Sequence, residues 1–368
     1  MRYALALCLL VGWLSPAALA QPVSPDVDSL GQALVQGHSG GAVIGVLRPD
    51  TSTVHGFGRV DSTGASPTAR TIFEVGSVTK TFTGVLLADA IEHGGVEAST
   101  PVRFLLPDSV TWSYADSVDT STPTMTLGHL ATHRSGLPRL PSNLNAAIRP
   151  TDPYAAYGDS ALYAFLDGYM VPRAPDAGHE YSNLGMGLLG HLLARRADTT
   201  YAALVRRRIT KPLGLADTRI HLTDEQTRRV AQGHTRAGAP APPWHFEVLA
   251  GAGALRSTAA DMLAYLRAHR RALRTSTDAT PLQRAMRRAT TPHASTGREG
   301  TRIGYGWHQS TRDGHAVLWH SGGTGGFRSF VGLDRTTGRG VVVLVSAAVS
   351  SARVTEAGGT LLRSLRPK

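Results

Sequence analysis

Cysteine is almost absent from this 368-residue chain, with Cys8 as its single occurrence. Cys8 lies in the apolar run of residues 4–14, and the small residues of Ala18-Leu19-Ala20 follow where signal peptidase reads them. We therefore predict that residues 1–20 are a signal peptide, cleaved near Ala20, and that the protein is exported to the periplasm or secreted. The mature chain then holds no cysteine, which excludes disulfides and leaves the core alone to stabilise the fold.

Long apolar runs are also missing. The run at 4–14 is too short to span a bilayer and no later segment reaches that length, so we expect no permanent membrane anchor. Lysine is scarce too: it occurs only at positions 80, 211 and 368, although the formal net charge is +11. The many arginines are scattered without interleaved aromatic residues, which argues against nucleic-acid binding. Because lysine is so scarce in this chain, its occurrence at position 80 indicates a specific role.

Segments of strand character occur near both ends of the chain, and helical patterns fill the middle. The strands are predicted at 41–47, 54–60, 316–319, 327–333 and 340–346, and the helices beside them at 27–36, 261–273 and 352–365. We expect an α/β (α+β) fold in which one antiparallel sheet is built from both terminal segments, flanked by helices, with a mostly helical domain inserted. The sheet-bearing part is placed at about 21–100 and 255–368 and the helical insertion at about 101–254, with the functional cleft between them.

The segment 73–93 predicts a helix that begins at Gly76-Ser77, and it places Ser77 and Lys80 three residues apart. Residues at that spacing share a helix face, so the amine can approach the hydroxyl. The helix N-terminus also favours negative charge that develops near Ser77. A serine hydroxyl is a weak nucleophile until a neighbour takes its proton. Lysine can take that proton because its pKa falls readily on desolvation, whereas arginine cannot serve.

Two later segments complete a pattern with this pair. Tyr181-Ser182-Asn183 follows a loop that contains proline and glycine, and His320-Ser321-Gly322-Gly323 follows the predicted strand at 316–319. Together the three segments resemble the three motifs of the β-lactamase and penicillin-binding-protein-like serine hydrolases, in that family's chain order. Residues 129–138 and 211–215 resemble further family segments, so the likeness runs from about residue 30 to the C-terminus. It is closest to the branch that contains class C β-lactamases, DD-peptidases and related esterases.

The resemblance implies roles for these residues. Ser77 would be acylated by a substrate carbonyl, and Tyr181 would carry protons with Lys80 as its partner, whose charge is expected to depress the tyrosine pKa. Asn183 would orient Lys80 and the substrate amide. The backbone amides of Ser77 and Gly323 would form an oxyanion hole, and water would release the acyl group. No metal or organic cofactor is implied.

The third motif departs from the class C pattern. Class C β-lactamases usually carry Lys-Thr-Gly where this chain has His320-Ser321-Gly322. The resemblance assigns His320 and Gly322 to substrate binding. A lysine would be a permanent cation for a substrate carboxylate, whereas a histidine, with an unperturbed pKa of about 6.5, is charged only part of the time. The His-x-Gly form is more typical of the DD-peptidases, aminopeptidases and esterases of this branch.

The sequence therefore predicts an exported serine hydrolase of the class C β-lactamase family that cleaves a β-lactam or related amide through an acyl-enzyme on Ser77. Two alternatives stay open: a D-Ala-D-Ala carboxypeptidase/endopeptidase or carboxylesterase of the same family, and a penicillin-binding sensor that does not hydrolyse its ligand. The expected partner is a small-molecule or peptidoglycan-derived substrate. Nothing in the sequence indicates the oligomeric state.

Two other patterns resemble known sites but occur in the wrong context. The segment 37–41 matches Gly-x-Ser-x-Gly, yet a helical pattern precedes it and a strand follows, the reverse of the order in a nucleophile elbow. His129 and His133 are four residues apart, as zinc ligands on a helix are, but no acidic third ligand lies nearby. We expect a plain turn at the first place and buried or loop-bonded histidines at the second.

Overall fold

The structure is a computed structural model that describes residues 25–115, 124–144, 151–275, 277–312, 314–347 and 349–365. The predicted signal peptide, with Cys8 and the cleavage site near Ala20, lies outside the described residues. Among the helices that are described, none is both long and apolar enough to cross a membrane.

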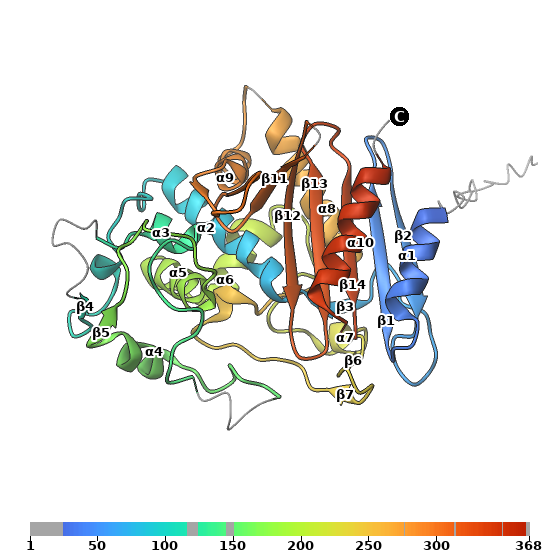
Figure 1. Ribbon diagram of the computed structural model, residues 1–368, viewed down its shortest axis with the longest axis horizontal. Helices are drawn as coiled ribbons and strands as arrows, with labels where there is room; N and C mark the ends of the chain where they lie inside the picture. The colour runs from blue at the N-terminus through green and yellow to red at the C-terminus, as the bar shows by residue number, and fades with distance from the viewer. Residues whose placement is uncertain are drawn as a thin grey trace, which may run out of the picture.

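One antiparallel sheet of eight strands dominates the fold (Figure 1). The order of its strands is β2-β1-β14-β13-β12-β11-β10-β9. The N-terminal hairpin therefore pairs with the C-terminal strands, because β1 is hydrogen-bonded to β14, and the prediction of a sheet built from both ends of the chain is confirmed. The strand bounds are β1 (Gly41–Leu47), β2 (Ser52–Gly58), β9 (Ala294–Ser295), β10 (Thr301–Ile303), β11 (His308–Arg312), β12 (His315–Gly323), β13 (Arg328–Asp334) and β14 (Gly340–Val345).

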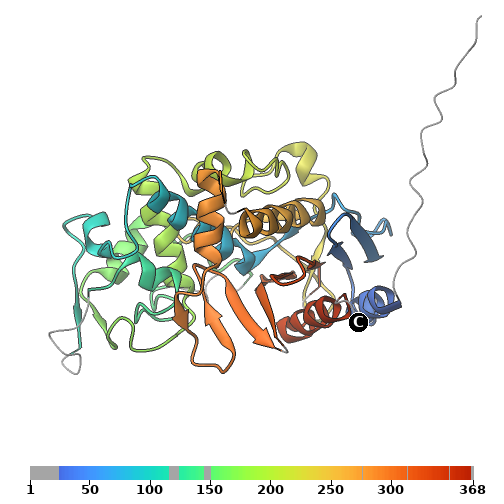
Figure 2. The same cartoon turned by 90° about the horizontal axis from the view of Figure 1, so that it is seen from above.

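The centre of this sheet is covered on both faces. On one face lie α1 (Pro25–Val35) and α10 (Ser351–Ser364), and on the other lies α8 (Ala259–Arg274) (Figure 2). Successive residues of a strand point to opposite faces, so both sets of β14 side chains must be apolar. Val341, Val343 and Val345 pack in the core under α1 and α10, while Val342 and Leu344 pack in the core under α8. The double burial explains why β14 reads as a continuous apolar run.

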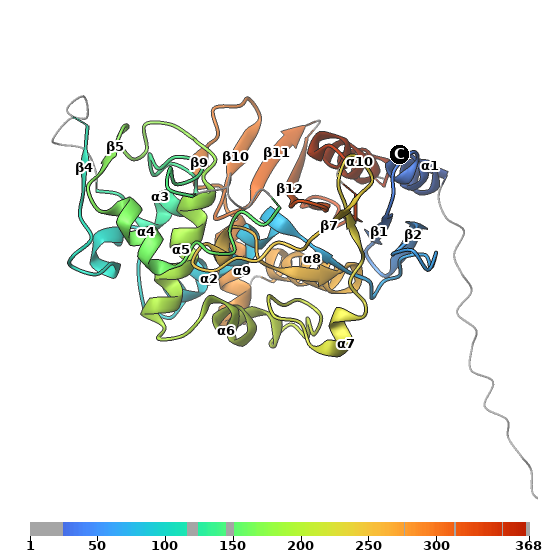
Figure 3. The same ribbon diagram turned by 90° about the horizontal axis from the view of Figure 1, so that it is seen from below.

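Most of the remaining helices gather at the end of the molecule away from α1 and α10 (Figure 3). Their bounds are α3 (Leu127–Ala131), α4 (Asp159–Leu166), α5 (Asn183–Arg196), α6 (Tyr201–Val205), α7 (Asp224–Thr227) and α9 (Pro281–Thr290), with a π-helical turn η3 (Arg206–Thr210) and the 3₁₀ turns η2 (Val102–Leu105) and η4 (Ala250–Ala252). The small strand pairs are β3 (Ile72–Glu74) with β8 (Arg256–Thr258), β4 (Trp112–Tyr114) with β5 (Tyr169–Val171), and β6 (Gly233–His234) with β7 (Pro240–Ala241).

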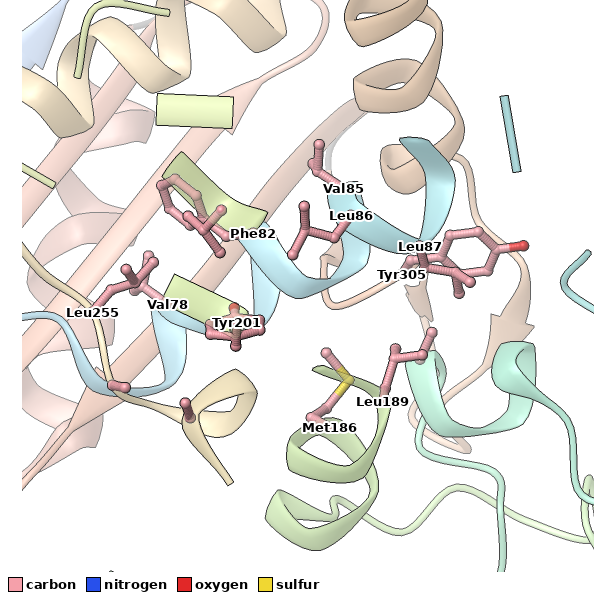
Figure 4. Close-up of a cluster of buried hydrophobic side chains, with 14 of the residues drawn as sticks. Val78, Phe82, Val85, Leu86, Leu87, Met186, Leu189, Tyr201, Leu255 and Tyr305 are labelled. Carbon is pink, nitrogen blue, oxygen red and sulfur yellow. The ribbon is translucent and has the colours of Figure 1, made fainter. Parts of the chain in front are cut away.

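The helix α2 (Thr79–Glu92) lies between these helices and the sheet. It packs against α5 and α9, and every residue from Thr79 to Asp89 is buried. Figure 4 shows Phe82 and Leu86 of α2 among side chains from other elements, including Met186 and Leu189 of α5. A helix buried all round has no polar face, so its apolar pattern is not confined to one side. Because α2 is enclosed, a polar side chain that it carries into the core is removed from water.

The predicted helix at 73–93 differs from the structure at its beginning. Residues 72–74 form the strand β3, which pairs with β8, and Ser77 lies in the 3₁₀ turn η1 (Gly76–Val78) that precedes α2. Phe73 pairs with Ser257, a partner far away in the sequence, so local periodicity could not reveal this strand. The second predicted strand, at 54–60, lies two residues earlier, at 52–58. The helix α9 and the short strands β9 and β10 were not predicted.

The enclosure of α2 makes a prediction about Gly84. A Cβ added at Gly84 would lie 1.9 Å from the backbone oxygen of Tyr305, so Gly84→Ala must displace backbone. We expect this substitution to lower the free energy of unfolding by about 1–3 kcal/mol in urea titrations, in spite of alanine's higher helix propensity. Gly359→Ala in α10 is the matched control, because an added Cβ there meets only Arg363 at 3.5 Å. The control should be neutral or stabilising, and equal effects at both positions would contradict the close packing of α2.

Candidate active site

Ser77 lies in the turn between β3 and α2, where it lines a cavity of about 890 Å³. The turn is fixed on both sides: Val75 N donates to Leu255 O at 3.1 Å, and Ser329 Oγ donates to Val75 O at 2.7 Å. Gly76, which precedes the serine, has a φ of +50°, a conformation that favours glycine. The sharp turn leaves Ser77 partly exposed while Val78 and Thr79 behind it are buried.

Lys80 lies directly behind Ser77, and its side chain is fully buried. Its Nζ is 2.9 Å from Ser77 Oγ and donates a hydrogen bond to the carbonyl oxygen of Ala252 at 2.6 Å. Burial lowers the pKa of Lys80 well below its usual 10.5, and the positive charge of Arg139 lowers it further. A neutral amine that donates one N–H to Ala252 still has a lone pair that can accept the proton of the serine hydroxyl. The pair is therefore arranged for transfer of the Ser77 proton to Lys80.

Tyr181 approaches Ser77 from the loop before α5. Its phenol is hydrogen-bonded to Ser77, and its ring centroid is 4.9 Å from Lys80 Nζ. Burial raises the pKa of the Tyr181 phenol above its usual 10, although the hydrogen bond to Ser77 and the charge of Arg139 oppose this shift. The expected depression of this pKa by Lys80 is thus wrong, because desolvation is the largest effect on the phenol and the buried Lys80 amine is itself disposed to be neutral. At neutral pH Tyr181 is a protonated phenol, able to donate a hydrogen bond.

Asn183 is the first residue of α5, and Ser182 caps that helix. The Asn183 side chain donates to the hydroxyl of Tyr154 at 3.1 Å, and its Oδ1 is buried with no hydrogen-bond partner in the part of the chain that the structure describes. We expected Asn183 to orient Lys80, but no hydrogen bond joins the two side chains. The Ala252 carbonyl holds the amine instead, since it is Lys80's second partner besides Ser77.

The third motif ends the strand β12, which passes the Ser77 turn. A Cβ added at Gly76 would lie 2.7 Å from Gly323 N, and one added at Gly322 would lie 2.1 Å from Val75 O and 3.0 Å from Ser77 N. The two backbone segments approach so closely that only glycine fits at both positions. This contact brings the amides of Ser77 and Gly323 to neighbouring places at the edge of the cavity.

His320 is buried in the wall of the cavity, with an exposed fraction of 2%. Its Nδ1 donates to the carbonyl oxygen of Ser321 at 2.6 Å. Burial, together with His308 and Lys80, lowers the pKa of His320 well below 6.5. The ring is therefore neutral at neutral pH and protonated at Nδ1. Its Nε2 is left as an acceptor, buried and without a partner among the described residues.

Several residues in or beside the cavity were given no role in the site by the sequence. Tyr154 stacks on Phe246 with 4.4 Å between ring centroids and lies 5.6 Å from Trp244, which gives the cavity an aromatic wall. The ring of His133 packs against that of Tyr181 at 4.5 Å, and its Nδ1 accepts from Ser182 N. Isolated aromatic and histidine residues give no motif, so only the fold brings them to the site.

The structure also places the two patterns that we set aside. Ser39 lies in the turn between α1 and β1, away from the residues that line the cavity, so the expected helix-to-strand turn is confirmed. His129 accepts from Thr126 N in the capping box of α3, and His133 is the buried residue that bonds Ser182. His129 is thus bonded within its own helix cap and His133 is buried, as we expected.

Comparisons with known proteins agree with this geometry. The family model described as Beta-lactamase matches residues 27–362. A beta-lactamase of Pseudomonas fluorescens is 25% identical over an alignment of 379 residues, which covers 94% of this chain and 99% of the relative. The D-alanyl-D-alanine-carboxypeptidase/endopeptidase AmpH of Escherichia coli K12 is 26% identical over 289 residues, which covers 76% of this chain and 72% of the relative.

The fold is shared with solved structures as well. A beta-lactamase/D-alanine carboxypeptidase from Pseudomonas syringae superposes with a TM-score of 0.79 at 20% sequence identity, covering 93% of this chain and 99% of that structure. At this identity the similarity shows a shared fold and says nothing about the substrate.

The contact between Lys80 and Ser77 predicts that the lysine is needed for nucleophilic attack. Lys80→Arg keeps the positive charge but removes a group that can become neutral, so the rate of Ser77 labelling by a fluorophosphonate should fall by about 10²–10⁴-fold. Intact-mass spectrometry of timed samples measures this rate. Lys211→Arg, at an exposed position, is the control and should label normally. Normal labelling of Lys80→Arg would remove the lysine from the mechanism.

The lowered pKa of Lys80 predicts a pH profile for the unaltered protein. The reactive form holds a neutral amine, so labelling should rise with pH and reach its half-maximal rate well below pH 10.5. As the pH falls through the lowered pKa, Lys80 becomes protonated and labelling should slow. A half-maximum at or above pH 10.5 would show that Lys80 does not titrate as a buried amine.

Proposed function

Because this chain belongs to the beta-lactamase family, which makes it a serine hydrolase, we propose that it is an exported enzyme that hydrolyses a β-lactam or related amide through an acyl-enzyme on Ser77. The observation that carries this proposal is the buried Lys80 amine, 2.9 Å from Ser77 Oγ. A buried lysine with a lowered pKa beside a serine hydroxyl is the arrangement that nucleophilic catalysis by serine requires.

Acylation begins when Ser77 Oγ attacks the substrate carbonyl carbon and Lys80 accepts the hydroxyl proton. Negative charge then develops on the carbonyl oxygen, and the backbone amides of Ser77 and Gly323 stabilise it. One such donor contributes about 10²–10³-fold in kcat, because it is already oriented before the reaction. The glycine contact at Gly76 and Gly322 supports this role, since it holds the two amides side by side.

Collapse of the tetrahedral intermediate breaks the bond from carbonyl carbon to leaving group. The leaving nitrogen needs a proton; in this proposal the protonated phenol of Tyr181, bonded to Ser77, donates it and regains one from Lys80. The unpartnered Oδ1 of Asn183 can accept a hydrogen bond from a substrate amide N–H. Water then attacks the acyl-enzyme and frees Ser77. The reaction balances with water alone as co-reactant.

A second candidate is favoured by His320. Its ring is neutral, so the third motif offers a hydrogen-bond acceptor where a lysine would offer a charge. This supports a D-Ala-D-Ala carboxypeptidase/endopeptidase or a carboxylesterase of the same family as the alternative. One curated relative is named as such a carboxypeptidase/endopeptidase. Export rests on the signal-peptide pattern of residues 1–20.

Parallel steady-state kinetics on nitrocefin, a D-Ala-D-Ala peptide and p-nitrophenyl butyrate tests this proposal. We expect turnover of nitrocefin, and a benzylpenicillin adduct on Ser77 in intact-mass spectra. Ser77→Ala should abolish both, because it removes the nucleophile and leaves the cavity otherwise unchanged. Turnover of the peptide or the ester alone would establish the second candidate. A penicilloyl adduct that never hydrolyses would indicate a sensor, and neither adduct nor turnover of any substrate would overturn the proposal.

A further inference from the structure

The third motif contributes a neutral histidine to the cavity, although the chain as a whole has a formal net charge of +11. His320 is uncharged at neutral pH, and the other histidines that line the cavity, His179 and His308, also have lowered pKa values, that of His308 about 4. A cation that binds a substrate carboxylate in this cavity must therefore be a residue other than these histidines. Three arginines line the cavity: Arg139, Arg298 and Arg328.

Arg139 has a hydrogen-bonded backbone and a side chain without a polar partner among the described residues. Its carbonyl oxygen accepts hydrogen bonds from Asn183 N at 2.9 Å and Leu184 N at 3.2 Å, which ties it to the first turn of α5. Its guanidinium carbon lies 5.1 Å from the ring centroid of Tyr181. The side chain is exposed, and across the described ranges we find no ion pair or hydrogen bond to its guanidinium. Its charge also reaches the catalytic groups, since it lowers the pKa values of both Lys80 and Tyr181.

The other two arginines are less suited to bind a ligand beside Ser77. Arg328 donates to the carbonyl oxygens of Thr324 and Phe327, so its guanidinium already holds the loop after β12. Arg298 is exposed between β9 and β10, and its charge acts on His179 and His308 rather than on Lys80 or Tyr181. Of the three, Arg139 is thus the guanidinium that lies against Tyr181 and has no hydrogen bond or ion pair to the residues that the structure describes.

We propose that Arg139 determines specificity by binding the carboxylate of a substrate whose scissile carbonyl lies at Ser77. A guanidinium presents paired N–H donors that match a carboxylate, and its charge is permanent. Because the backbone is already held, only the side chain of Arg139 has to be ordered when the anion binds. The inference rests on the proposed function, because it concerns the same cavity and the same acyl transfer.

A matched pair of thioesters tests the role of Arg139. One has thioglycolate as leaving group, with a free carboxylate, and the other carries the same group as its methyl ester. In the unaltered protein we expect a higher kcat/KM for the acid than for the ester. Arg139→Gln should lower the ratio of the two values by about 10- to 100-fold, because charge-assisted hydrogen bonds are lost. Arg139→Lys should retain part of the ratio, since it keeps the charge without the paired donors.

Arg298→Gln is the matched control, an exposed arginine of the same cavity changed in the same way. It should leave the ratio within about threefold of the unaltered protein, since its charge does not reach Lys80 or Tyr181. A second readout is the pH profile of fluorophosphonate labelling. Removal of the Arg139 charge should shift that profile to higher pH, because the pKa of Lys80 rises when a neighbouring cation is lost.

The outcomes separate this inference from the proposed function. An unchanged ratio and pH profile in Arg139→Gln, with both thioesters hydrolysed, would overturn the role of Arg139 and leave the enzyme proposal intact. A ratio that collapses in Arg298→Gln but not in Arg139→Gln would assign the carboxylate to Arg298 and equally overturn it. If the unaltered protein hydrolyses neither thioester and forms no penicillin adduct, the proposed function itself fails.

Discussion

Lys80 occupies a position that water does not reach, between the hydroxyl of Ser77 and the carbonyl of Ala252. Burying an ammonium without a counter-charge is costly, so the surroundings favour the neutral amine. The packing of α2 keeps the amine in this position. The helix is buried over residues 79–89, so it cannot move its lysine toward solvent. The reactivity of Ser77 therefore depends on the hydrophobic core behind it as much as on the residues in the cavity.

The sheet supplies the second half of the site. Since β12 pairs with β13 and β13 with β14, the third motif is held by strands that are anchored to the N-terminal hairpin. The close approach of Gly322 and Gly76 then brings that strand against the nucleophile turn, with Ser329 Oγ bonded to Val75 O between them. Two segments separated by about 245 positions in the sequence thus meet at distances that leave no room for a side chain. Such a site is rigid because backbone, and not flexible side chains, sets its dimensions.

The titratable groups around Ser77 are neutral, whereas the arginines that line the cavity are charged. Tyr181 stays protonated, and His133, His308 and His320 stay neutral, since burial disfavours their charged forms. In the proposed mechanism, proton transfer among Ser77, Lys80 and Tyr181 would therefore start from groups that are uncharged at rest. The permanent charge is carried by arginines at the edge of the cavity. The charge of Arg139 nevertheless acts on the pKa values of Lys80 and Tyr181, so a carboxylate bound there would also affect the groups proposed to carry the proton.

The residues of the site could be named from the sequence because each belongs to a local pattern: Ser77 with Lys80, Tyr181 with Asn183, and His320 with the glycines 322 and 323. The sheet from both termini was likewise predictable, since a strand buried on both faces leaves an unbroken apolar run such as 341–345. The sequence could not show that β3 precedes the nucleophile, because its partner β8 lies some 180 residues away. Nor could it show that Lys80 is hydrogen-bonded to the Ala252 carbonyl and not to Asn183, since residue types do not reveal which backbone oxygen a side chain will meet. The direction in which the pKa values of Lys80, Tyr181 and His320 shift was decided by tertiary structure, because desolvation depends on how completely distant segments enclose each group.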